Sequence, residues 1–376
     1  MPATDHGGQL VSIQILRAAA ALGVTGGHIV SYEFVTQYGL SDALPAFPTG
    51  QLGVDVFFVI SGLVMVYTSE RYRARGSLEF FLRRLARIVP LYWATTTIIL
   101  CYLVLHYHDL AAVNFTPMLV LASYLFIPVP HTDGFMAPVN GVGWTLNYEM
   151  FFYACFSVAV LFSRRIGVVL LALALLCFVG FNSAIPQPPP FGYWAKPIIL
   201  EFVFGMMIGL ALREGVRIPT IVSLAMVIAA IAVRIVYRDT RLLGWGVSAA
   251  LIVGACALST RSVSCTGPVC RALSFLGDAS YALYLVHPIA ITLPRRRFPH
   301  FIDAATHPWL YVALLLCIAI AAAIVVHVVF ERPTTRVLQR AIKSMVGRTT
   351  FGPSGLEAAP EMEAGSGAFG PNPPRS

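Results

Sequence analysis

Charged residues are scarce in this sequence, and their scarcity excludes a water-soluble domain. Of 376 residues, 12% are charged and 57% are hydrophobic, whereas soluble proteins carry about 25% charged residues. The charges lie mainly in short segments between apolar runs of roughly 18–22 residues, about the length that crosses a bilayer once. The sequence therefore predicts an all-α, polytopic integral membrane helix bundle.

Cysteine is also sparse, and its placement excludes further classes. Five of the seven cysteines lie inside apolar runs, and only Cys265 and Cys270 share a loop. We therefore expect neither a disulfide framework nor a bound metal. The net charge of +8 does not indicate nucleic-acid binding, because basic residues gather at the cytoplasmic face of membrane proteins.

Ten apolar runs are long enough to cross a bilayer. An eleventh run, at 117–127, is too short to cross, so we expect it to be re-entrant or interfacial. With ten crossings and a cytoplasmic N-terminus, the inner segments hold 18 Lys and Arg and the outer loops hold six. Counting 117–127 as a crossing gives 12 on each side. The positive-inside rule thus favours ten crossings with both termini cytoplasmic. The predicted crossings are 10–32, 50–69, 88–107, 143–162, 166–183, 195–212, 218–237, 242–260, 272–293 and 309–330.

The membrane domain is predicted to occupy residues 1–345. Residues 346–376 are rich in Gly, Pro and Ala and lack apolar periodicity. We expect them to form a disordered cytoplasmic tail.

Ionisable residues inside crossings are costly and indicate a functional site. Arg17 and His28 are 11 residues apart on the first crossing, which places them within about 20° of one helix face and about 16 Å apart along it. We expect both to face the bundle interior, with His28 nearer the outside. Four titratable residues fall in the outer halves of their crossings: His28, Asp55, Glu149 and His287. Together they predict a site that binds a hydroxyl and moves a proton. Glu201 lies at the same depth, but nothing around it adds to the case.

Arginines crowd the cytoplasmic end of the third crossing. Topology explains most of them, but Arg84 and Arg87 have the i, i+3 spacing of one helix face, which suits phosphate oxygens, and Arg83 adjoins them. Glu331, at the inner end of the last crossing, is the expected partner of this cluster or of Arg17. These residues alone fit either a group-transfer enzyme with a phosphorylated cytoplasmic donor or a secondary transporter of an anionic or acylated solute.

Five segments in order resemble the membrane-bound acyltransferase-3 family, and most closely its branch that acylates bacterial exopolysaccharides. The resemblance runs from about residue 10 to residue 335. The segments are 16–22 followed by His28, Gly-Val-Asp-Val-Phe-Phe-Val-Ile-Ser-Gly at 53–62, Arg-Arg-Leu-Ala-Arg-Ile-Val-Pro at 83–90, Gly-Trp-Thr-Leu-Asn-Tyr-Glu-Met-Phe-Phe-Tyr at 143–153, and 280–287.

The resemblance implies O-acylation, usually acetylation, of a sugar hydroxyl by acetyl-CoA or another acyl-CoA supplied from the cytoplasm. Arg17 and His28 match the family's essential pair, and Arg84 and Arg87 match the Arg-x-x-Arg motif linked to the donor. The implied partners are a polysaccharide or lipid-linked acceptor, the lipid bilayer of the bacterial cytoplasmic membrane, and polysaccharide-assembly proteins.

Each candidate residue has an expected role. His28 is the expected general base, and Glu149 or Asp55 would orient it or compensate its charge. Arg17 would hold the thioester end of the donor or a neighbouring carboxylate. An acyl-serine at Ser61 has little support, because no histidine follows it on its helix. The further substrate-site candidates are Ser61, Trp144, Tyr281 and His287.

Overall fold

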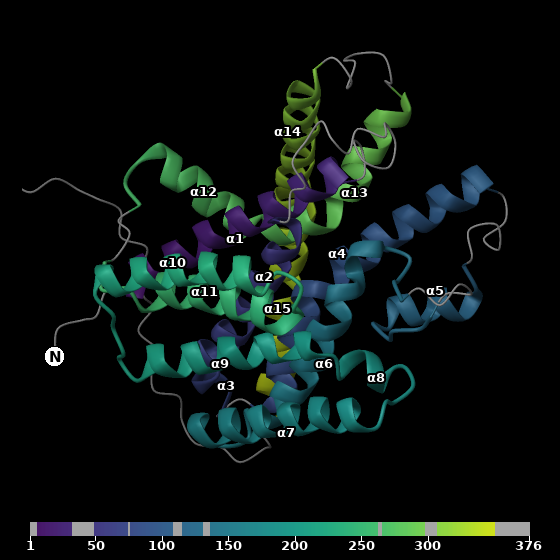
Figure 1. Cartoon of the computed structure of the whole chain (residues 1–376). Coiled ribbons are helices and arrows are strands. Elements are labelled where there is room, and N and C mark those ends of the chain that lie inside the picture. Colours follow the sequence, from purple (N-terminus) through teal and green to yellow (C-terminus); the bar gives the residue numbers. More distant parts are fainter. Residues whose placement is uncertain are drawn as a thin grey trace, which may run out of the picture.

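The computed structural model describes residues 6–31, 49–73, 76–107, 115–130, 136–261, 265–297 and 307–349. These residues are helical apart from turns and one isolated bridge between Ile218 and Ser259, which confirms the all-α class. The elements in Figure 1 are α1 (His6–Ile29), α2 (Thr49–Thr68), α3 (Glu70–Arg73), α4 (Ser77–Tyr107), α5 (Pro117–Tyr124), η3 (Gly141–Gly143), α6 (Trp144–Ala159), α7 (Arg164–Ala184), α8 (Phe191–Trp194), η4 (Pro197–Ile199), α9 (Leu200–Arg213), α10 (Thr220–Val236), η5 (Arg241–Val247), α11 (Ser248–Leu258), α12 (Pro268–Asp278), α13 (Ser280–Arg297), α14 (Pro308–Val326), η6 (His327–Glu331) and α15 (Arg332–Thr349).

Several of these helices can cross a membrane, so the chain is a multi-pass membrane protein. Within the described residues, five helical stretches are long and apolar enough, and α12 with α13 makes a sixth if the bent pair is one span. Each of the ten predicted crossings coincides with helix, but four of these helices are not among the candidate spans: α1, and the shorter α6, α9 and α10 of 16, 14 and 17 residues. The short run at 117–127 forms the eight-residue α5.

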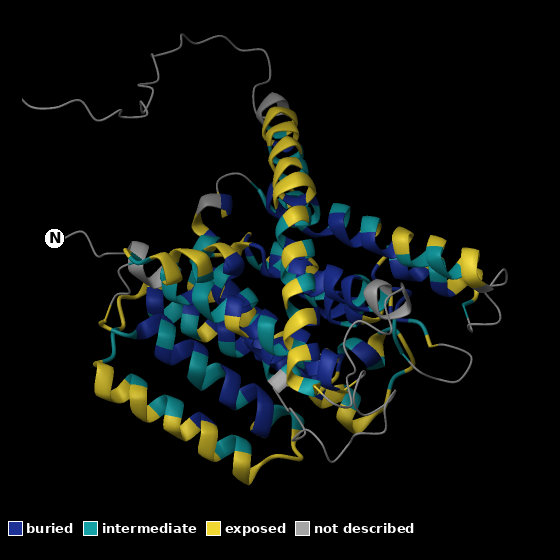
Figure 2. Cartoon of the chain, turned by 90° about the horizontal axis from the view of Figure 1, so that it is seen from above, coloured by how far each residue is buried: buried dark blue, intermediate teal, exposed yellow. Residues whose placement is uncertain are grey.

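The outer surface of the bundle is apolar, as a lipid-facing surface requires. Along α10, Ile221, Ile228 and Ile235 are 70%, 60% and 70% exposed. Figure 2 shows buried residues gathered in the middle of the bundle and exposed ones along its outer helices. So wide an apolar exterior is not typical of a soluble monomer.

The centre of the bundle is α2, which packs closely against α9. A side chain at Gly62 would meet the carbonyl oxygen of Phe202, and one at Gly205 would meet that of Val59. Small residues at both positions therefore let the two backbones touch. Phe202 also stacks on Phe58 and on Phe152 of α6, with ring centroids 4.6 and 4.3 Å apart. These contacts hold α6 in place for the site described below.

One predicted crossing, 272–293, is not a straight helix, because the chain bends by 74° between α12 and α13. Two contacts with α1 clamp the bend. The side-chain nitrogen of Gln14 donates to Asp278 Oδ1 at 2.7 Å, and Arg17 Nη2 donates to Ser280 Oγ at 2.9 Å. A side chain at Gly277 would meet the Gln14 backbone, so glycine allows this close approach.

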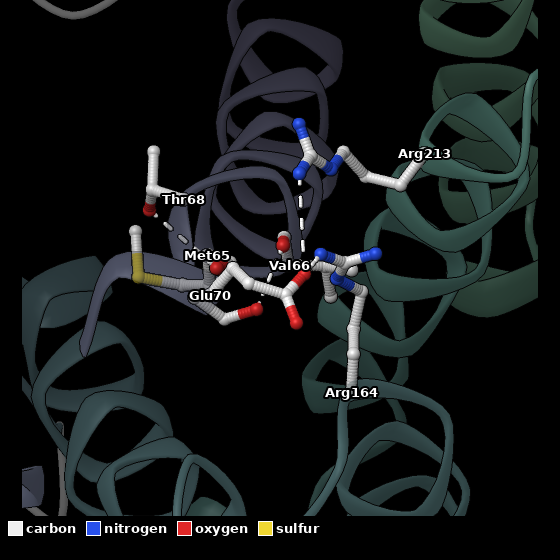
Figure 3. A network of polar contacts seen from close by, with 7 residues as sticks. Met65, Val66, Thr68, Glu70, Arg164 and Arg213 are labelled. Atoms are coloured by element: carbon white, nitrogen blue, oxygen red, sulfur yellow. Dashed lines mark hydrogen bonds and ion pairs between the residues drawn. The ribbon is translucent and has the colours of Figure 1, made fainter. Parts of the chain in front are cut away.

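At one end of the bundle, Glu70 ties the turn after α2 to two other helices. Its carboxylate pairs with Arg164 of α7 and lies 3.9 Å from Arg213 of α9, as Figure 3 shows.

Among the seven cysteines, all of which lie in described residues, Cys265 and Cys270 form a local disulfide and the other five are free. The structure therefore contains one local disulfide bond, although the sequence predicted no disulfide framework.

Candidate functional site

Two cavities lie along the same four helices, α1, α4, α6 and α13. The larger, here called the histidine cavity, has a volume of about 1440 Å³. The smaller, here called the arginine cavity, has a volume of about 100 Å³. Residues of all four helices line the histidine cavity, among them His28, Ile98, Tyr148 and His287. The corresponding residues of the arginine cavity are Arg17, Arg84, Glu149 and Tyr281.

Two predicted site residues meet in the histidine cavity. His28, in the last turn of α1, places Nδ1 2.7 Å from Nε2 of His287, and the two rings stack with centroids 5.0 Å apart. His28 is exposed to the cavity, whereas His287 is fully buried. Nδ1 of His287 lies 3.0 Å from the carbonyl oxygen of Leu283, one turn earlier on α13.

Aromatic and cationic residues line the rest of the histidine cavity. Trp144, Tyr148 and Tyr193 form one wall, where the Tyr148 hydroxyl donates to the Tyr193 carbonyl at 2.8 Å and the Tyr193 hydroxyl to the Trp144 carbonyl at 3.3 Å. Lys196 and Arg241 are the charged residues of the described lining, which includes no carboxylate. Flat aromatic surfaces with a few fixed polar groups are typical of a site for an organic ligand.

Asp55 lies behind this lining and not beside His28. Its Oδ1 is 2.5 Å from Arg241 Nη2, and the same nitrogen is 3.8 Å from Glu201 Oε1. Both carboxyl groups are fully buried, whereas the Arg241 side chain is about one third exposed, at 34%. Asp55 therefore orients Arg241. Glu201 belongs to the same cluster, although no neighbouring residue in the sequence indicated this.

The arginine cavity gathers the basic residues of two helices. Arg84 Nη2 donates to Thr68 Oγ1 at 3.3 Å, and its guanidinium lies over the rings of Phe80 and Tyr153. Arg87 and Arg17 line the same cavity. The structure thus brings Arg84, Arg87 and Arg17 together, which the spacing of Arg84 and Arg87 alone could not establish.

Glu149 lies in the arginine cavity too, away from His28. Its Oε1 accepts hydrogen bonds from Ser61 Oγ at 2.9 Å and from the Tyr153 hydroxyl. The four titratable groups expected to share one chamber are therefore divided among three places. The physical reason is helix rotation: Tyr148, one residue earlier on α6, lines the histidine cavity, whereas the side of α6 that carries Glu149 faces the arginine cavity.

Two further candidates lie outside the lining of either cavity. Arg83 pairs with Glu79 one turn earlier on α4, at 2.7 Å. Glu331 bonds to His327 at 2.7 Å within the π-helical turn η6, and its charge also interacts with that of Arg17. Tyr281 does line the arginine cavity, and its hydroxyl donates to the Ile88 carbonyl at 2.7 Å.

Tyr284 separates the two cavities. On α13 the lining changes from the arginine cavity at Tyr284 to the histidine cavity at His287, within one turn. The Tyr284 hydroxyl is 2.9 Å from Thr145 Oγ1 and donates to the Val142 carbonyl at 3.0 Å. This hydrogen-bonded layer, named here the Tyr284 partition, joins Val142 of the histidine-cavity lining to Thr145 and Tyr284 of the arginine-cavity lining.

Sequence reasoning missed Arg241 and Tyr284. A signal for Arg241 exists, because it falls in a predicted outer segment, where the positive-inside rule makes arginine uncommon, directly before a predicted crossing. Tyr284 carries no such signal, since a tyrosine inside an apolar run is ordinary. Among the described residues, no group of three or more His, Cys, Asp or Glu side chains is placed to hold a metal ion.

Comparison with known proteins supports a single family. The profile of the acyltransferase-3 family, described as an acyltransferase domain, matches residues 10–328. The exopolysaccharide production protein ExoZ of Rhizobium meliloti (strain 1021) is 36% identical over 267 residues, covering 66% of this chain and 78% of ExoZ. Acyltransferase MdmB of Streptomyces mycarofaciens is 30% identical over 373 residues, covering 88% of this chain and 93% of MdmB. No solved structure matches the chain significantly.

Proposed function

This chain belongs to the acyltransferase-3 family, and from this premise we propose that it is an integral membrane O-acyltransferase. It transfers an acyl group, acetyl in the simplest case, from acyl-CoA to a sugar hydroxyl of an exported polysaccharide or of its lipid-linked precursor. The observation that carries the proposal is the succession of an arginine-lined and a histidine-lined cavity along the same four helices. The name of the relative ExoZ, an exopolysaccharide production protein, supports a polysaccharide acceptor.

The proposed topology has ten crossings of the bacterial cytoplasmic membrane and both termini in the cytoplasm. It puts the arginine cavity toward the cytoplasm, where acyl-CoA is available, and the histidine cavity toward the outside. Accessibility labelling of single cysteines placed in the segment 70–87 and after residue 331 tests this orientation, because both are expected to react only from the cytoplasmic side.

The arginine cavity is the proposed donor site. Arg84 and Arg87 supply charged donors for phosphate oxygens, and the Phe80 and Tyr153 rings restrict the Arg84 side chain. A volume of about 100 Å³ is below the roughly 300–1,000 Å³ of ordinary ligand sites. This cavity therefore admits the narrow thioester arm of the donor and not its nucleotide, which stays at the mouth near the arginines.

The histidine cavity is the proposed acceptor site. His28 takes the proton of the acceptor hydroxyl while the hydroxyl oxygen bonds to the thioester carbon. The carbon–sulfur bond then breaks, and His28 returns the proton to the departing thiolate, so that the ester and free CoA are the products. A positioned base of this kind contributes roughly 10²–10⁴ in rate.

A secondary transporter remains the competing function, and turnover separates the two. In detergent, where there is no sealed compartment, the acyltransferase releases free CoA and forms acylated acceptor in equal amounts. Purified protein, acetyl-CoA and cell-envelope polysaccharide are the components, a thiol reagent measures the CoA, and mass spectrometry measures the acylated sugar. If acetyl-CoA stays intact in detergent while solute moves across sealed vesicles, the protein is a transporter.

A further inference from the structure

The two histidines of the histidine cavity form a chain of hydrogen bonds whose direction is fixed at one end. His287 Nδ1 lies 3.0 Å from the backbone carbonyl oxygen of Leu283. A carbonyl oxygen can only accept a hydrogen bond, so Nδ1 of His287 must carry a hydrogen. In a neutral imidazole the other nitrogen, Nε2, is then without a hydrogen and can only accept.

The tautomer of His287 in turn determines which nitrogen of His28 carries the hydrogen. Nε2 of His287 lies 2.7 Å from Nδ1 of His28, and since Nε2 accepts, Nδ1 of His28 must donate. Neutral His28 therefore has its hydrogen on Nδ1, which leaves Nε2 as the basic nitrogen. Within the described residues Nε2 of His28 has no hydrogen-bond partner, and the His28 side chain lines the cavity.

We propose that His287 is a positioning residue that fixes the tautomer of His28 and so leaves the basic Nε2 of His28 free for the acceptor hydroxyl. The proposal rests on the acyltransferase function proposed above. When His28 takes the hydroxyl proton on Nε2, its Nδ1 hydrogen stays bonded to His287, which stabilises the imidazolium. The Leu283 carbonyl holds His287 in the only tautomer that can do this, much as a buried carboxylate orients the histidine of a catalytic triad.

Full burial of His287 strengthens the argument. No part of its side chain is exposed, so water cannot replace His28 as the partner of Nε2, and a buried unpaired nitrogen costs about 1–3 kcal/mol. With the hydrogen on Nδ1 of both histidines, each ring nitrogen of His287 has a hydrogen-bond partner: Nδ1 donates to the Leu283 carbonyl oxygen and Nε2 accepts from His28.

Kinetics of His287 variants test the role. His287→Phe keeps a ring but removes the acceptor, so the His28 hydrogen is no longer held on Nδ1. We expect kcat to fall at least about 100-fold, within the range for loss of a general base, with the KM for acetyl-CoA within about twofold. His287→Gln puts an amide oxygen near the position of Nε2, and we expect it to restore kcat to within about tenfold of the wild type.

The chain offers a matched control. His106 makes the same bond between Nδ1 and the carbonyl four residues earlier, that of Tyr102, at 2.9 Å, and it is exposed on α4. His106→Phe should leave kcat within about twofold. If folded His287→Phe keeps kcat within about threefold, or if His287→Gln is as poor as His287→Phe, the positioning role is refuted.

A spectroscopic measurement tests the tautomer without any turnover. In protein labelled with ¹⁵N-histidine, protonated and unprotonated ring nitrogens resonate far apart, and His28→Gln identifies the His28 signals among the nine histidines. We expect a hydrogen on Nδ1 of His28 in the wild type and on Nε2 in a substantial fraction of His287→Phe. A hydrogen on Nε2 in the wild type overturns the inference. If the wild type has the expected tautomer but forms no acylated product, the proposed function fails and the hydrogen-bond assignment stands.

Discussion

The sharpest test of the donor site removes the two arginines that line its mouth. Arg84 and Arg87 have one helix face in common, and both line the arginine cavity with Arg17. Arg84 already donates to Thr68 Oγ1 at 3.3 Å, a long and weak bond that a phosphate oxygen would readily replace. Arg84→Ala combined with Arg87→Ala should therefore weaken donor binding far more than acceptor binding.

The expected size of the effect follows from the hydrogen bonds that are lost. A hydrogen bond to a charged group contributes about 1.5–3 kcal/mol, and each 1.4 kcal/mol changes affinity about tenfold. Because Arg84 and Arg87 are only half-buried, we count only about half of the two contributions. The double variant should then raise the KM for acetyl-CoA at least about tenfold, while the KM for the acceptor stays within about twofold.

The assay compares initial rates of CoA release at varied acetyl-CoA and at varied acceptor. Arg213→Ala is the control, because Arg213 pairs with Glu70 at 3.9 Å outside either cavity (Figure 3) and such exposed pairs contribute little. Arg83→Ala should also have little effect, since its partner is Glu79. An unchanged KM for acetyl-CoA in the folded double variant refutes the assignment of this cavity to the donor.

Three further predictions concern the other parts of the site. His28→Gln should lower transfer at least about 100-fold with little change in the KM for acetyl-CoA, because an amide keeps a hydrogen bond but cannot take up the proton; substantial remaining transfer would make His28 positional. Arg241→Met leaves the carboxylates of Asp55 and Glu201 without their cation. It should lower the free energy of unfolding by about 3 kcal/mol, the low end for a broken buried pair, because Arg241 is partly exposed. Asp55→Asn should lower it less, and thermal unfolding in detergent measures both variants. Tyr284→Phe removes the bonds to Thr145 and Val142, which should let water reach the thioester. CoA release in the absence of acceptor should then rise about fivefold for each 1 kcal/mol by which the partition is weakened. If CoA release does not rise, the partition does not keep water from the thioester.

The positions of the helices could be predicted because length and hydropathy alone decide them. A run of about 20 apolar residues has few alternatives to a membrane helix, and each predicted crossing coincides with helix. The same rule cannot detect polar helix beyond a crossing. Thus α4 begins at Ser77 and not near residue 88, because its first turns are amphipathic and carry Arg83 and Arg84.

The bend between α12 and α13 was not predictable from hydropathy. At the bend, the predicted crossing 272–293 runs through Gly277, Asp278 and Ser280 without a proline, and one glycine and one charge do not by themselves place a bend. What decides the bend is tertiary contact, since Gln14 and Arg17 of α1 bond to Asp278 and Ser280 on either side of it. A prediction of this bend needs the neighbour of each helix, which a single sequence does not supply.

A single sequence predicts the depth of each site residue along its crossing, but it does not predict the direction of the side chain around the helix. Residue number along a crossing fixes depth at about 1.5 Å per residue, whereas a step of one residue turns the side chain by about 100°. On α6 this difference decides the chemistry. Trp144 and Tyr148, four residues apart, line the histidine cavity, whereas Thr145 and Glu149, shifted by one residue, line the arginine cavity. Both faces carry aromatic and polar residues, so amphipathicity cannot tell them apart. In the proposed reaction an acyl group that moves from the arginine cavity to the histidine cavity passes Tyr284, and Thr145 is the α6 residue that bonds to Tyr284.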